Sequence, residues 1–124
     1  MAWLNRLKTK HFDSDALWNR VHGDVALFRE LVDVFDAEVP GMLAEVEKAI
    51  KHGSPSNLEK ASHKIKGSML QFSAPAAANI ALQLEENGRI GSMASTGSLL
   101  QNLRQETSEL QQTLHAMVRD KSQP

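Results

Sequence analysis

Apolar residues recur at steps of three and four positions along most of the chain, which is the spacing of a buried helix face. The longest such series, from Phe28 to Ala49, predicts a long helix that Gly53 closes. Pro40 lies inside this helix and lacks a backbone N–H donor. We therefore expect one helix with a bend near residues 36–40 rather than two unrelated helices.

Four further helices are predicted from shorter series of the same kind and from capping residues at their ends. One is short and precedes the long helix, and the other three follow it. No alternating pattern of the kind that marks a strand stands out. Together with the long helix, the predicted segments are residues 13–21, 24–53, 54–72, 75–88 and 98–118.

Small and polar residues predict where the later helices begin and end. Ser73 can act as the N-cap of the helix that follows it. We interpret Gly88 as the end of that helix and residues 89–95 as a loop. Ser98 followed by Gln101 has the spacing of a capping box, which places the start of the last helix there.

Four long amphipathic helices joined by short turns must bury their apolar faces against one another. The sequence therefore predicts an all-α fold, namely an antiparallel up-and-down four-helix bundle with a short additional N-terminal helix. At 124 residues, the chain has the size of a single domain. We assign residues 12–120 to the bundle, 1–11 to an N-terminal lead-in of open role and 121–124 to a C-terminal tail.

Composition and charge exclude several classes of function. A formal net charge of −1 offers no basic field for nucleic acid or for an anionic membrane surface. The chain has no cysteine, which excludes disulfides, a thiolate nucleophile and cysteine-based zinc sites. No apolar run is long enough to cross a membrane, and the start lacks the apolar core of a signal peptide. We expect a cytoplasmic protein without membrane insertion, and a complete bundle core predicts a monomer.

The helix over residues 54–72 carries a glycine at an exposed position. His63 points away from the apolar stripe of this helix. The same outer face carries Lys66, Gly67 and Leu70, at i+3, i+4 and i+7 from the histidine. Glycine inside a helix costs about 0.8–1 kcal/mol relative to alanine. We interpret Gly67 as providing room, so that another protein's backbone or a bulky anion can approach the imidazole.

This outer face has the composition of a docking site for chemistry on a phosphate. A neutral imidazole is nucleophilic at pH 7, and the Lys66 ammonium is a mobile cation suited to a phosphoryl group. Leu70 adds an apolar spot. The remaining histidines lie near predicted helix ends or in polar settings and are assigned no chemistry: His11, His22, His52 and His115.

Metal and ATP sites are the main rival uses of such a chain. Glu59 and His63 stand at i and i+4, but two outward ligands without a third make a poor metal site, so none is predicted. The paired Glu-x-x-His motifs of di-iron bundles and the His-Glu-x-x-His motif of zinc proteases are missing. No glycine-rich phosphate loop is found, and we expect no ATP-dependent kinase activity of the chain's own.

Residues 63–68 read His-Lys-Ile-Lys-Gly-Ser and resemble the signature of the histidine-containing phosphotransfer (HPt) domains of phosphorelay signalling, which has the form His-x-aliphatic-Lys-Gly-small. The likeness covers roughly residues 12–118. Residues 12–35 are similar to the run that leads into the family's long second helix, and residues 84–89 resemble the end of its fourth helix.

The chain departs from the family pattern at two places. Met69 stands where members often have a small residue, and Ser73-Ala74 stands where Gly-Ala is frequent. Met69 lies on the predicted core stripe, so we interpret it as filling bundle volume without affecting the chemistry. The capping role predicted for Ser73 makes the second change a mild one.

The resemblance implies roles for particular residues. It implies that His63 is phosphorylated, that Lys66 neutralises phosphoryl charge and that Gly67 gives access. Glu85 stands where the family has a polar residue that can hydrogen-bond the imidazole, although an exposed helix carboxylate remains an equal interpretation. A docking surface for the partner is expected to include Ser68, Leu70, Leu17 and Val21.

The function predicted by the resemblance is that of a phosphorelay intermediate. His63 would accept a phosphoryl group from the aspartate of a receiver domain, in a response regulator or a hybrid sensor histidine kinase, and pass it to another receiver. The chain needs no cofactor, because Mg²⁺ is expected on the receiver. The alternative is a helical adaptor that binds a receiver without phosphotransfer. The cognate kinase and regulator, the direction of flow and membership of a larger hybrid kinase are left open.

Overall fold

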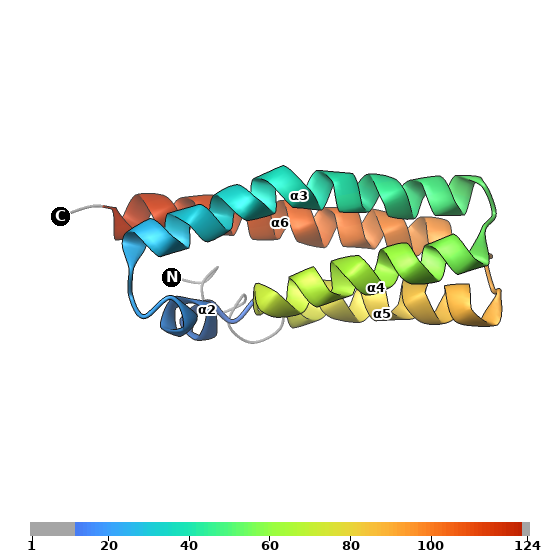
Figure 1. Ribbon diagram of the computed structural model, residues 1–124, viewed down its shortest axis with the longest axis horizontal. Helices are drawn as coiled ribbons and strands as arrows, with labels where there is room; N and C mark the ends of the chain where they lie inside the picture. Colours follow the sequence, from blue (N-terminus) through green and yellow to red (C-terminus); the bar gives the residue numbers. More distant parts are fainter. Residues whose placement is uncertain (1–11, 123–124) are drawn as a thin grey trace.

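The computed structural model describes residues 12–122, and this part of the chain is built from helices. Four long helices, α3 (Val25–Lys51), α4 (Pro55–Gln71), α5 (Pro75–Ile90) and α6 (Thr96–Lys121), form an antiparallel up-and-down bundle (Figure 1). A short helix, α2 (Ser14–Arg20), lies at one end of it. The predicted fold class is confirmed. The lead-in assigned to residues 1–11 lies outside the described residues, and the division into segments stays a prediction.

Helix α3 forms the longest wall of the core. The Asp24 carboxylate caps it by accepting from the backbone N–H of Leu27 at 3.1 Å. The helix continues without a break through Pro40, and Figure 1 shows its axis changing direction near mid-length. Leu43 is buried on its core stripe, and the neighbouring Met42 is only half-buried. The buried residues are Phe28, Val32, Phe35, Val39, Leu43, Val46 and Ala49.

The turn between α4 and α5 corrects the cap predicted at Ser73. Helix α5 has Ala74 at its N-cap, with no side-chain hydrogen bond. Ser73 instead adopts a left-handed conformation with φ of 55°, and its hydroxyl oxygen is buried without a hydrogen-bond partner. Its carbonyl accepts from the backbone N–H of Asp13 at 2.8 Å. The residue therefore joins the turn to the segment before α2 and does not cap α5.

Gly88 does not end α5, contrary to the sequence interpretation. The helix continues to Ile90 and ends at Gly91, whose φ of 79° suits a residue without a side chain. Gly88 is buried, and a Cβ atom there would lie 2.6 Å from the backbone nitrogen of Glu59 and 2.7 Å from the carbonyl oxygen of Pro55. Gly88 therefore allows the backbones of α4 and α5 to come close together.

The last helix also begins earlier than predicted. Helix α6 starts at Thr96 with Ser95 at the N-cap, and the Ser95 side chain makes no capping bond. The Ser98 hydroxyl donates to the carbonyl of Ser95 at 3.4 Å, so it does not form the predicted capping box with Gln101. Thr96 is buried and donates to the carbonyl of Met93 at 2.8 Å. The N-cap therefore lies three residues upstream of the predicted one, and the burial of Thr96 agrees with this earlier start.

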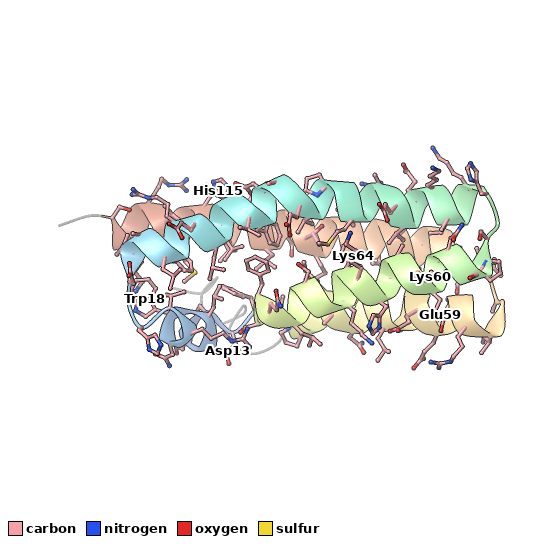
Figure 2. All side chains as sticks on the ribbon, viewed as in Figure 1. Asp13, Trp18, Glu59, Lys60, Lys64 and His115 are labelled. Carbon is pink, nitrogen blue, oxygen red and sulfur yellow. The ribbon has the colours of Figure 1, made fainter. Side chains whose placement is uncertain are left out.

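Helix α2 covers one end of the bundle through its apolar side. The ring of Trp18 packs against that of Phe28 in α3 in a T-shaped arrangement, with centroids 5.6 Å apart. The ammonium of Lys121, at the end of α6, lies 4.5 Å from the centroid of Trp18. Trp18 and Asp13 are labelled at this end in Figure 2. These contacts connect α2 to both α3 and α6.

Candidate functional site

The site lies on the outer face of α4, midway along the helix. The opposite, inner face of α4 carries Ser62 and Ile65, which are completely buried. Their burial fixes the rotation of α4 about its axis. His63 is consequently directed outward, and 69% of its side chain is exposed. A ring so placed is accessible to a second protein.

Glu85 of α5 holds the imidazole from one side. Its side chain is only 12% exposed, and its Oε2 lies 2.7 Å from Nδ1 of His63. An ionised carboxylate has no proton to donate, so Nδ1 carries the hydrogen and Nε2 of the neutral ring keeps its lone pair. Glu85 is therefore not an exposed helix carboxylate, and the interpretation in which it hydrogen-bonds the imidazole is the one that agrees with this geometry.

Lys66 contacts the same carboxylate. Its Nζ donates to the second oxygen, Oε1, at 2.5 Å, and its side chain is 23% exposed. Burial alone raises the pKa of Glu85, but the hydrogen bonds from Lys66 and His63 and the positive charge outweigh burial, so the pKa is lowered from 4.5. Glu85 is thus ionised at neutral pH and links two residues of α4 that are one turn apart.

Lys66 is not the mobile cation that the sequence predicts. The lysine is held by Glu85 and is mostly covered. Sequence spacing placed Lys66 on the same face as His63, but it could not show that a carboxylate from another helix lies between them. The three residues form one hydrogen-bonded cluster, with Glu85 in the centre.

The surface beside the imidazole is open. A Cβ atom at Gly67 would meet no atom within 4 Å, so a substituent there would project into space next to His63. Leu70, one turn further on, is 54% exposed, and Ser68 is half-buried. A free space with an apolar residue at its edge can accept part of a partner protein.

Leu17 and Val21 do not belong to this surface, although we predicted them as part of it. They are 1% and 2% exposed and pack in the core together with Phe12. Apolar residues of a short amphipathic helix face the bundle, because contact with its core removes them from water. The docking surface therefore excludes the two side chains.

Arg20 is a residue near the site that sequence reasoning missed. It lies in the last turn of α2, and its Nη1 donates to the carbonyl oxygens of Leu70, at 3.5 Å, and of Gln71. A guanidinium at the C-terminal end of α4 complements the carbonyls of the last turn and the negative end of the helix dipole. No sequence pattern pairs residues fifty positions apart in this way.

Within residues 12–122, His, Asp and Glu side chains form no group of three placed to hold a metal ion. In the same range, no helix has both the length and the apolar character needed to cross a bilayer.

Comparisons with known proteins agree with this geometry. The family model described as the Hpt domain matches residues 30–113. Among solved structures, the chain is similar to histidine-containing phosphotransfer protein B (HptB) from Pseudomonas aeruginosa PAO1, with a TM-score of 0.84 and 20% sequence identity, over 90% of this chain and 97% of that chain. A likeness at this identity shows the fold alone. No curated protein sequence matches the chain.

Proposed function

Because this chain belongs to the Hpt domain family, whose members serve histidine phosphotransfer in phosphorelays, we propose that it accepts a phosphoryl group on His63 from a receiver-domain aspartate and passes it to the aspartate of another receiver. One observation carries the assignment of the residue. His63 is exposed, and its Nδ1 is engaged by Glu85, which leaves Nε2 as a free nucleophile pointing to solvent.

In the proposed transfer, the Nε2 lone pair attacks the phosphorus atom of the aspartyl phosphate. The N–P bond forms as the P–O bond to the aspartate breaks, and the aspartate leaves as a carboxylate. The ring gains positive charge while Nδ1 keeps its proton. Glu85 accepts a hydrogen bond from this N–H group, with 2.7 Å between Nδ1 and Oε2. Its negative charge therefore stabilises the positively charged ring as the N–P bond forms. Transfer to the next receiver is the reverse of these steps.

Lys66 supplies positive charge beside the phosphoryl group. Its ammonium is held on Oε1 of Glu85, the carboxylate that also contacts His63, so its positive charge stays close to the imidazole. A small bundle can work in this way because phosphoryl transfer depends mainly on positioning and on charge neutralisation. The divalent cation of the reaction, Mg²⁺, would be held by the receiver.

Docking would use the open surface around His63. The empty space at Gly67 admits the partner's backbone, and the exposed Leu70 offers it an apolar contact, with the half-buried Ser68 between them. Exclusion of water from such a contact would strengthen the interactions of Glu85 and Lys66 with the reacting atoms.

The test is transfer of labelled phosphate from phosphorylated receiver domains to the protein, beside a His63→Gln variant. The expected product is an acid-labile label on the wild-type chain alone. His115→Gln is the matched control, because His115 (Figure 2) also contacts a carboxylate, with Nε2 2.7 Å from Oδ2 of Asp36. Label that persists in His63→Gln would overturn the site. Binding of receivers without any transfer would favour an adaptor instead.

A further inference from the structure

A groove of about 440 Å³ lies between the C-terminal half of α3 and the N-terminal half of α4. Its floor is formed by two small buried residues, Ala49 and Ala61. Its rim carries the exposed side chains of Lys48, Lys60 and Lys64. This groove takes no part in the cluster of His63, Lys66 and Glu85.

The groove is strongly basic in a chain whose net charge is −1. Three lysines line it, together with His52 and a single carboxylate, that of Glu45. Over the described part of the chain, none of these lysines makes an ion pair with a carboxylate. The positive charge of the groove is therefore available to a negatively charged partner.

The lysines on the rim repel one another. Lys60 and Lys64 stand at i and i+4 on α4, where like charges repel and cost a few tenths of a kcal/mol, roughly 0.2–0.5. Lys48 adds a third positive charge from the opposite wall. No ion pair within residues 12–122 relieves this repulsion, so an acidic partner surface would reduce it on binding.

The groove begins next to the proposed phosphorylation site. Lys60 precedes His63 by three residues and Lys64 follows it directly, so both lie within one turn of the imidazole. Figure 2 labels both lysines on the edge of α4 that faces α3. A partner large enough to cover His63 would also extend over this edge.

We propose that this groove receives an acidic surface segment of the receiver domain that docks over His63. The inference rests on the proposed function and names the charge of the partner surface. A small molecule is a poorer fit, because the lining is exposed apart from its alanine floor and would not enclose a ligand. Charges at the edge of an interface speed association and set its salt dependence.

The test compares three variants in which three residues are changed together. Lys48, Lys60 and Lys64 are replaced by Gln, which removes the charge, or by Arg, which keeps it. The control replaces Lys51, Arg104 and Arg119, which lie outside the groove lining, by Gln, so the net charge changes equally. For each protein, the second-order rate constant of phosphotransfer, the limiting rate at saturation and receiver binding by calorimetry are measured at several salt concentrations, beside thermal unfolding.

The Gln variant of the groove is expected to lose about tenfold in the second-order rate constant and to show a weaker dependence on salt. Its limiting rate should be unchanged, and its melting temperature should change little, because relief of the repulsion between Lys60 and Lys64 offsets the loss of Lys48 from the last turn of α3. The Arg variant and the control should behave as the wild type. An unchanged rate constant and salt dependence in the Gln variant would overturn the proposal, and so would a lower limiting rate with unchanged binding.

The experiment distinguishes failure of the groove proposal from failure of the phosphotransfer proposal. If the wild type takes no label from any receiver but binds one, the phosphotransfer proposal fails, and the binding data alone decide about the groove. If the wild type is labelled on His63 and the groove variant binds and reacts equally well, phosphotransfer stands and the groove proposal falls.

Discussion

Replacement of Gly67 by alanine should separate stability from phosphotransfer. The glycine lies inside α4 at an exposed position, and a Cβ atom there would meet nothing within 4 Å. The new methyl group would therefore cause no clash in the free protein. It would project one turn beyond His63, into the space through which we propose that the receiver approaches.

The expected gain in stability follows from helix propensity alone. Alanine is favoured over glycine by about 0.8–1 kcal/mol in a helix interior. No packing loss reduces this value at Gly67, since the site is open. For a domain of this size, the gain corresponds to a rise in melting temperature of about 3–6 °C.

The rate of phosphotransfer should fall although the stability rises. We expect Gly67→Ala to lower the rate of transfer from a phosphorylated receiver, and the longer side chain of Gly67→Gln to lower it further. Urea unfolding followed by circular dichroism gives the free energy of unfolding, and labelled transfer gives the rate. A fully active Gly67→Gln protein would refute the view that the glycine provides access, and a destabilised Gly67→Ala protein would refute the helix-propensity argument.

Three further results are expected. Gly88→Ala should destabilise the protein by about 1–3 kcal/mol or more in urea unfolding, because its Cβ would lie 2.6 Å from the Glu59 backbone nitrogen and only a backbone shift could relieve the overlap. Glu85→Gln should slow phosphotransfer less than Glu85→Ala, because the amide oxygen can still accept from Nδ1; equal rates would argue against this hydrogen bond. The pKa of Glu85 is lowered in the fold, so its contribution to stability is present above about pH 4.5 and is lost as the pH falls through the folded-state pKa. Wild-type stability should therefore decline more steeply than that of Glu85→Gln as the pH falls below 4.5, and parallel curves would contradict this.

The helix ends show where sequence patterns were insufficient. Ser73, Gly88 and Ser98 all have the residue types of helix boundaries, yet none of them forms the predicted one. Local preferences of about 1 kcal/mol compete with tertiary packing, and packing decides. Gly88 is the clearest case, since the residue that reads as a helix stop allows two helices to approach closely.

The sequence by itself determined the number and order of the long helices and the outward direction of His63, because a 3.6-residue period relates every side chain to the apolar face of its own helix. Only the tertiary structure decided which groups from other helices lie beside that histidine. The pairing of Glu85 with both His63 and Lys66 depends on the axial register between α4 and α5. That register is set by packing across the core, and no period within a single helix contains it.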